Sequence, residues 1–282
     1  MKKVFKILVK LIIFLGVMGM FILGAPFSIL AYPLHILNKP LCIRLSTFFT
    51  YTLWTLISWM FNLSSTVHGS IDIGNESYFV ISNHIGSVDF ILINEIARKS
   101  GMISHVKYAV KDGLRVFPVF YQIIVYVGFL VLKRSFEKDK KKIIRYLEFF
   151  NTSGIPIWFV FYPEGSRFSE ELKLKSWKYS DEKGMARLNN VLFPRYKGFK
   201  LICENLKNSR IKKIVDVTFS YSENEVPPLW KFLFCDTTGI FNCDIRVVSI
   251  DEIDDYEKFL YKSFERKDTL ITKWNSNATK EK

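Results

Sequence analysis

The N-terminal part of the chain is dominated by long stretches without charged side chains. Residues 11–38 contain no Asp, Glu, Lys or Arg, and Lys2, Lys3, Lys6 and Lys10 precede them. A helix of about 20 apolar residues is enough to cross the hydrocarbon core of a bilayer, whereas the apolar part of a secretory signal peptide is shorter, roughly 7–15 residues. The length of this stretch therefore predicts a retained membrane anchor.

A second uncharged stretch, residues 45–71, contains Trp54 and Trp59 together with several Ser and Thr. It can form a second membrane span, or lie at the interface with its hydroxyl groups facing the lipid headgroups. A hydrophobic helical hairpin packed on its own domain is the alternative. Basic side chains lie on both sides of the first stretch, so the positive-inside rule does not fix an orientation. We expect residues 1–70 to form membrane-anchoring helices.

The chain as a whole is strongly basic, with 40 Lys and Arg against 27 Asp and Glu and a net charge of +13. A basic surface attracts polyanions, which include nucleic acids, anionic lipid headgroups and phosphate-bearing substrates. The uncharged stretches favour lipid and no nucleic-acid-binding motif is recognisable, so we expect a lipid bilayer as partner and no nucleic acid. The cysteines lack zinc-ligand spacing, and we expect no metal site.

Residues 71–274 alternate between apolar runs and charged segments. Residues 78–82, 155–162 and 214–221 are short runs rich in β-branched and aromatic side chains, typical of buried strands. Residues 133–148 are highly charged with apolar side chains at helical spacing, and predict an amphipathic surface helix. This alternation predicts an α/β domain with a mixed, mostly parallel central sheet flanked by helices.

Three smaller expectations concern individual segments. Ser87 is a candidate N-cap for a helix extending to about Arg98, with Asp89 in its first turn. Residues 119–132 are uncharged but too short for an ordinary membrane span, and predict a buried or interfacial helix or strand. The polar tail, residues 275–282, is expected to be disordered.

A first polar motif follows the strand at residues 78–82, where residues 83–89 read Asn-His-Ile-Gly-Ser-Val-Asp. A neutral imidazole can take the proton of a hydroxyl group at working pH, and a carboxylate can orient the ring and stabilise the imidazolium. A strand-to-helix turn can fold back so that Asp89 reaches His84. On its own, however, a His and an Asp at this spacing more often mean an ordinary turn.

A second polar motif follows the strand at residues 155–162, where residues 161–169 read Phe-Tyr-Pro-Glu-Gly-Ser-Arg-Phe-Ser. Ligands of α/β sheets gather outside the carboxyl ends of the strands, so this turn can share one crevice with His84. Arg167 can grip a phosphate through two N–H groups, Gly165 permits close approach, and Glu164 can orient the arginine or a substrate hydroxyl. By itself this motif also reads as an ordinary turn.

Together the two motifs resemble the glycerolipid acyltransferase family, which includes bacterial and eukaryotic 1-acylglycerol-3-phosphate acyltransferases. The resemblance implies that His84 is the general base and Asp89 its partner. It also implies an acceptor-binding site formed by residues of the second motif and by Arg134, which matches an acceptor-binding arginine of the family. These residues are Arg134, Glu164, Gly165, Ser166 (where threonine is more usual) and Arg167.

Further stretches resemble one branch of that family, the eukaryotic lysophosphatidic acid, lysocardiolipin and lysophosphatidylglycerol acyltransferases. They are residues 134–139, 192–199, 216–218 and 263–268. The resemblance implies an acyltransferase that uses acyl-CoA as co-substrate, a lysophospholipid acceptor and no other cofactor, most often in the endoplasmic reticulum, with mitochondrial or other membranes open. A non-catalytic basic membrane protein is the alternative from another class. The acceptor headgroup and the oligomeric state stay open.

Overall fold

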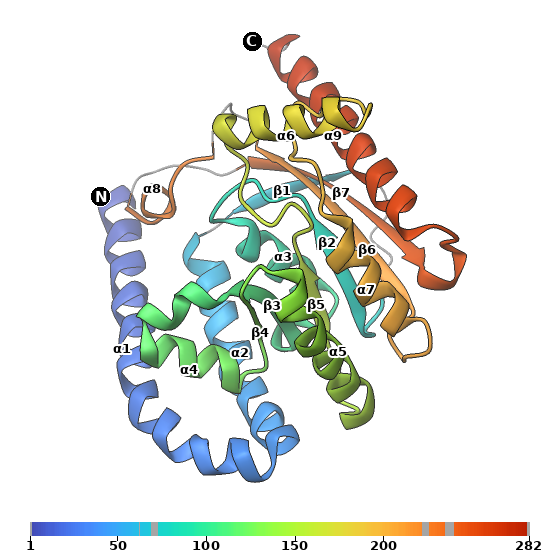
Figure 1. The fold of residues 1–282 in the computed structure, drawn as a ribbon. Coiled ribbons are helices and arrows are strands. Elements are labelled where there is room, and N and C mark those ends of the chain that lie inside the picture. The colour runs from blue at the N-terminus through green and yellow to red at the C-terminus, as the bar shows by residue number, and fades with distance from the viewer. Residues whose placement is uncertain (1, 62, 69–72, 222–225, 235–239, 281–282) are drawn as a thin grey trace.

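The computed structural model describes residues 2–61, 63–68, 73–221, 226–234 and 240–280 of the chain. Within these residues a seven-stranded sheet has the order β1-β7-β6-β2-β5-β3-β4 (Figure 1). The strands are β1 (Ser64–His68), β2 (Tyr78–Ser82), β3 (Val106–Lys111), β4 (Leu130–Leu132), β5 (Trp158–Phe161), β6 (Lys213–Tyr221) and β7 (Ile240–Ser249).

The sheet is mostly parallel, as the sequence predicts. Strand β2 lies between β5 and β6, and both neighbours run parallel to it. The exception is the pair β6–β7, which is antiparallel. All five residues of β2 are buried, because helices cover both faces of the sheet at this point.

Helices cover the two faces of the sheet with two separate apolar clusters. One cluster joins the sheet to α2, α3 and α8, and the other joins it to α5, α7 and α9. Figure 1 shows α5, α7 and α9 along the same side of the strands. The helices are α1 (Lys2–Leu37), α2 (Lys39–Phe61), α3 (Asp89–Lys99), α4 (Pro118–Tyr126), α5 (Phe136–Ser153), α6 (Glu170–Glu182), α7 (Tyr196–Leu206), α8 (Leu229–Phe234) and α9 (Tyr256–Lys280).

The region expected to anchor the chain forms α1 and α2, which pack against each other. Helix α2 also packs on the α/β domain through buried Leu53 and Ile57, and β1 already belongs to the central sheet. Across the part of the chain that the structure describes, no helix combines the length and the apolar character needed to traverse a bilayer. The boundary expected at residues 70 and 71 lies outside the described residues.

Some of the smaller expectations need correction. Ser87 is not the N-cap of α3: that position is Val88, without a side-chain cap, and the Asp89 carboxylate instead accepts the Gly86 N–H at 3.0 Å. Residues 119–132 form both a helix, α4, and a strand, β4. Residues 275–280 of the tail are helical rather than disordered, because α9 continues to Lys280, and residues 281–282 lie outside the described residues. The amphipathic helix predicted at residues 133–148 is confirmed as α5.

Candidate active site

The two polar motifs lie at one edge of the sheet. Strands β2 and β5 are parallel neighbours, so the loops after their carboxyl ends emerge side by side. The backbone N–H of Phe168 donates to the carbonyl of His84 at 2.8 Å. The imidazole of His84 stacks on Tyr162, with ring centroids 4.4 Å apart. The two loops are therefore parts of a single site.

His84 and Asp89 form a hydrogen-bonded pair. The distance between His84 Nδ1 and Asp89 Oδ2 is 2.5 Å, and Oδ1 of the same carboxylate accepts the backbone N–H of Gly86. Asp89 is buried, which raises the pKa of its carboxyl group, and the bond to His84 opposes that rise. A carboxylate partner keeps the proton on Nδ1, so Nε2 is the ring nitrogen that can accept a proton.

Glu164 is the buried support of the site. Its Oε1 accepts the backbone N–H of His84 at 2.8 Å, and its Oε2 accepts the backbone N–H of Leu192 at 3.0 Å. The side chain is 3% exposed, and burial raises the pKa of the carboxyl group to about 8 against the lowering effect of the two amides. Sequence reasoning expected this side chain to orient an arginine or a substrate hydroxyl, but its oxygens are bound to backbone.

Gly165 and Ser166 form the turn that follows Glu164. Gly165 has a φ of +71°, which a residue with a Cβ atom rarely adopts. A Cβ atom at this position would also lie against the guanidinium of Arg195. Ser166 is half-buried beside it. This turn leads to Arg167, whose side chain is exposed.

Arg134, Arg167 and Arg195 form a cluster of exposed guanidinium groups. Partial burial of the guanidinium, and after it the charges of Arg195 and Arg167, lowers the pKa of Arg134. The backbone N–H of Arg195 donates to the Pro163 carbonyl at 2.9 Å, which joins the loop before α7 to the second motif. Sequence reasoning named Arg134 and Arg167 but missed Arg195, although residues 192–199 carried the resemblance. Converging guanidinium groups are suited to a phosphate.

Asn83 fixes the residue before His84. Its side-chain amide donates to the Phe219 carbonyl at 2.8 Å and accepts the Phe219 N–H at 2.9 Å. These two bonds join the Asn83 side chain to the backbone of β6, two positions beyond Val217, the residue with which Ser82 pairs. The loop of His84 is therefore held by β6 through the Asn83 side chain and by Glu164 through the His84 N–H.

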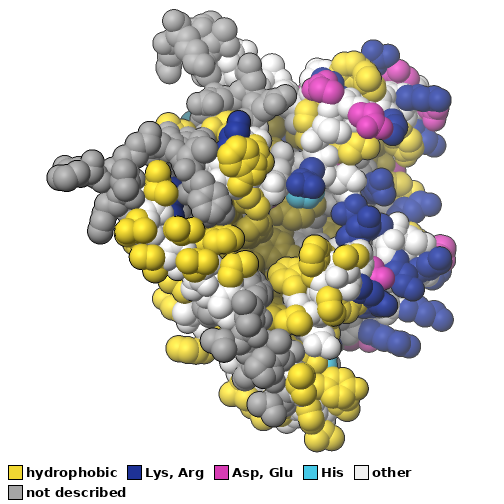
Figure 2. Space-filling model, turned by 90° about the vertical axis from the view of Figure 1, so that its left-hand side faces the viewer, with side chains coloured by type: hydrophobic (Ala, Val, Ile, Leu, Met, Phe, Trp, Pro, Cys, Tyr) yellow, Lys and Arg dark blue, Asp and Glu magenta, His cyan; other side chains and the backbone are white. Residues whose placement is uncertain are grey.

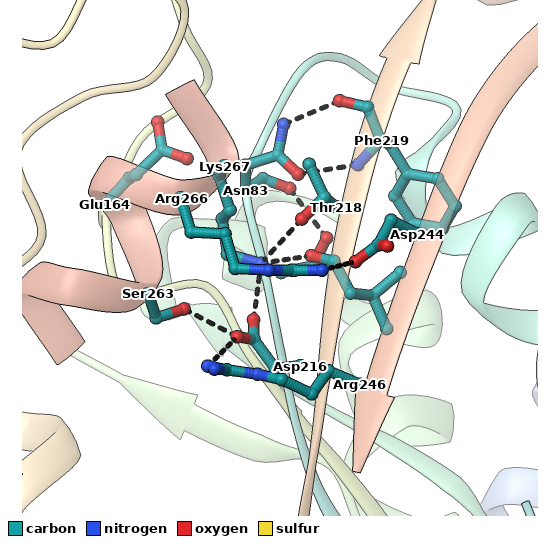
Figure 3. A network of polar contacts seen from close by, with 12 residues as sticks. Asn83, Glu164, Asp216, Thr218, Phe219, Asp244, Arg246, Ser263, Arg266 and Lys267 are labelled. Atoms are coloured by element: carbon teal, nitrogen blue, oxygen red, sulfur yellow. Dashed lines mark hydrogen bonds and ion pairs between the residues drawn. The ribbon is translucent and has the colours of Figure 1, made fainter. Parts of the chain in front are cut away.

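A buried ionic network connects β6 to α9 next to Asn83 (Figure 3). Lys267 of α9 and Asp216 of β6 are both fully buried, and Nζ lies 2.5 Å from the Asp216 carboxylate. Lys267 also donates to the Val217 carbonyl at 2.5 Å. Ser263 and Arg246 bind the other carboxylate oxygen of Asp216. The network therefore joins α9 to β6, the strand whose Phe219 backbone binds the Asn83 side chain.

The chain is similar to known acyltransferases. The family described as Acyltransferase matches residues 64–222, which is more than half of the chain. The chain is 28% identical over 203 residues to a probable 1-acyl-sn-glycerol-3-phosphate acyltransferase 5 of Arabidopsis thaliana, covering 71% of this chain and 54% of that protein. It is 27% identical over 230 residues to 1-acyl-sn-glycerol-3-phosphate acyltransferase epsilon of Mus musculus, covering 77% and 63%.

Among solved structures, the 1-acyl-sn-glycerophosphate acyltransferase PlsC from Thermotoga maritima matches with a TM-score of 0.54. The identity is 16%, and the match covers 96% of this chain and 98% of that one, which shows a shared fold. The chain belongs to the acyltransferase family. It spans roughly half to two thirds of the length of the first two curated relatives.

Proposed function

We propose that the protein transfers a fatty acyl group from acyl-CoA to the sn-2 hydroxyl of lysophosphatidic acid, as a step in phospholipid synthesis. The observation that carries this proposal is the placement of the His84–Asp89 pair and the arginine cluster around loops tied by the bond from Phe168 to His84. A base for a hydroxyl and a group of cations for a phosphate match an acceptor that has both. The names of the relatives point to the same acceptor.

In the proposed mechanism the acceptor hydroxyl is the nucleophile. Nε2 of His84 takes its proton while the oxygen attacks the thioester carbonyl carbon. The C–S bond then breaks, an ester remains on the lipid, and the imidazolium returns its proton to the departing CoA thiolate. Asp89 stabilises the imidazolium between these two events through its bond to Nδ1.

The arginine cluster would bind the acceptor phosphate. Arg134, Arg167 and Arg195 come from three loops, after β4, after β5 and before α7. Their mutual repulsion is relieved when a dianionic phosphate binds between them, which favours a phosphomonoester over a neutral headgroup. Lysophosphatidylinositol, lysocardiolipin and lysophosphatidylglycerol carry phosphodiesters, and an enzyme that remodels these lipids is the second candidate within the family.

We also propose that the protein is attached to a membrane, in the endoplasmic reticulum or another organelle, through its N-terminal helices. Helix α1 contacts both α2 and α4, and the three present large exposed apolar side chains. Figure 2 shows apolar side chains spread over this face and Lys and Arg side chains gathered along one edge of it. A face of this kind fits the interface of an anionic bilayer. The large exposed apolar side chains of α1, α2, α4 and the segment before α4 include Leu8, Leu11, Ile12, Leu15, Ile29, Tyr32, Ile36, Leu37, Leu41, Leu45, Phe48, Tyr51, Trp59, Val116, Phe117 and Phe120.

An acceptor panel tests the proposed function. Purified protein in detergent is offered radiolabelled oleoyl-CoA with lysophosphatidic acid, lysophosphatidylinositol, lysophosphatidylglycerol or lysocardiolipin, and both lipid product and free CoA are measured. We expect lysophosphatidic acid to react fastest, with one CoA released per ester formed. Faster acylation of a phosphodiester acceptor would favour the remodelling enzyme, and ester formation without CoA would indicate a transacylase. No product with any acceptor would favour a non-catalytic membrane protein.

A further inference from the structure

Arg134 has an unusual backbone conformation for its residue type. It lies between the end of β4 and the start of α5, and its φ is 61°. This left-handed conformation is unfavourable for a residue with a Cβ atom, and surrounding contacts must hold it in place. Glycine is the residue that such a turn ordinarily takes, so an arginine here indicates a need for its side chain.

The contacts that hold this turn come from the carboxylate of Asp139. Its Oδ1 accepts the backbone N–H of Lys133 at 2.9 Å, and its Oδ2 accepts the backbone N–H of Ser135 at 3.0 Å. These are the backbone N–H groups of the residues before and after Arg134, so one carboxylate holds the backbone at both of its neighbours. Asp139 is 5% exposed, and water therefore has little access to replace the two bonds.

Helix capping explains only part of this arrangement. Asp139 lies in the first turns of α5, where a negative charge is favoured by the helix dipole, and Ser135 is the N-cap without a side-chain cap of its own. A carboxylate that reaches back to the N-cap amide is a familiar capping device. The second bond, to Lys133, lies outside the helix and accounts for the turn at Arg134 rather than for the helix end.

The turn holds Arg134 near two like charges, since Arg195 and Arg167 are the charges that act on its guanidinium. Repulsion would favour rotation of the turn away from them when no anion is bound. We propose that Asp139 is a positioning residue for acceptor binding, because it binds the backbone N–H groups of both neighbours of Arg134 and so keeps that guanidinium in the arginine cluster. The inference rests on the proposed function, in which the cluster binds the acceptor phosphate.

The test compares Asp139→Asn with Arg134→Ala in the acyl-transfer assay. An amide nitrogen in place of one carboxylate oxygen cannot accept an N–H, so the turn loses one of its two bonds. We expect Asp139→Asn to raise the KM for lysophosphatidic acid roughly tenfold while kcat stays within about twofold of the wild type. Arg134→Ala should raise KM at least as much, and the double variant no further than Arg134→Ala alone.

A matched control lies two residues away in the same helix. Glu137 is an exposed carboxylate in the first turn of the same helix, bound to Lys140 at 2.6 Å, and Glu137→Gln should leave both kinetic constants unchanged. If Asp139→Asn lowers the yield of folded protein, Asp139→Glu replaces it. Asp139→Glu keeps the charge but displaces the carboxylate oxygens by one methylene. We therefore expect a smaller increase in KM than for Asp139→Asn, and no increase when Arg134 is already alanine.

The outcomes separate this inference from the proposed function. A KM increase with Arg134→Ala but none with Asp139→Asn overturns the positioning role and leaves the acceptor site intact. An additive increase in the double variant overturns it as well, because Asp139 would then act independently of Arg134. An unchanged KM with Arg134→Ala removes Arg134 from the acceptor site, and this inference fails with that assignment.

Discussion

The Nδ1 atom of His84 lies 2.5 Å from Oδ2 of Asp89, and this bond fixes which ring nitrogen can act as a base. The same carboxylate accepts the Gly86 N–H, so the ring is held to the turn that carries it. Exposure of the imidazole, at 21%, leaves it open to a substrate, whereas the carboxylate is 2% exposed. The pair is therefore built as a base with a buried orienting partner.

Asp89→Asn should lower kcat by roughly 10³–10⁴-fold, in line with the loss seen when the carboxylate of a catalytic triad becomes an amide. The amide nitrogen would donate to Nδ1 and move the ring proton to Nε2, which removes the base without removing the imidazole. Steady-state acyl transfer measures the effect. The control is Glu95→Gln on α3, whose carboxylate pairs with Arg98 on the surface. A variant with more than a tenth of wild-type kcat would contradict the assigned role of Asp89.

Arg195→Met should raise the KM for lysophosphatidic acid about tenfold, because one of the three guanidinium groups proposed to bind the phosphate is lost. Arg195→Lys should recover only part of the affinity, since an ammonium group lacks the two parallel N–H donors. Arg187 is the matched control: it is an exposed arginine bound to Asp181 at 2.7 Å. Equal KM values for the Arg195 and Arg187 variants would place Arg195 outside the acceptor site.

Lys267→Met should lower the free energy of unfolding by about 3–5 kcal/mol, because Asp216 would remain buried without its closest cation. Arg266→Met provides the comparison on the same helix. Arg266 pairs with Asp244 at 2.6 Å but is 34% exposed, so its loss should cost about 1 kcal/mol or less. Chemical denaturation in detergent gives both values, and similar losses for the two variants would show that burial of Lys267 is not what makes the pair important.

The stability of the protein should rise with pH between about 7 and 10 through Lys107. Burial lowers the pKa of this fully buried amine from 10.5 to about 7, and Nζ donates to the Ser104 carbonyl. Between these two pKa values the unfolded chain binds the proton that the folded chain does not, so higher pH favours folding, by up to about 1.4 kcal/mol per pH unit.

Lys107→Met should remove that component of the pH dependence, which denaturation midpoints at pH 7.5 and 9.5 measure. Lys111→Met on the exposed end of the same strand is the control and should leave the slope unchanged. Parallel slopes for the wild type and Lys107→Met would show that Lys107 keeps its proton on folding.

The strands of the core could be predicted because their sequence signal is local. Residues 78–82 are mostly aromatic or β-branched, and they form β2 over the same span. The meeting of the two polar motifs could also be predicted, because parallel neighbouring strands bring their carboxyl ends to one edge. Arg195 could not be found this way, since the bond from its backbone to Pro163 joins segments that no local pattern relates.

Other features of the structure depend on partners that are distant in the sequence. Lys267 looks like a solvated position in an amphipathic helix, yet it is fully buried because Asp216 lies opposite it on β6. The polar end of the chain is helical for a related reason: Ile271 and Trp274 pack on the core, so α9 has formed several turns before it reaches the tail. The role of Glu164 was hidden because its partners are backbone amides, which a sequence does not mark.

The most direct measurement is the rate of oleoyl transfer from oleoyl-CoA to lysophosphatidic acid by His84→Ala beside the wild type. His68→Ala serves as control, since that imidazole stacks on Trp274 and belongs to β1, which lies three strands away from β2 in the sheet. If His84 is the base, His84→Ala should lose at least about 10³-fold in kcat. The kcat of His68→Ala, and the folded fraction of both variants, should stay close to those of the wild type. A His84→Ala protein that forms phosphatidic acid at the wild-type rate would contradict the account.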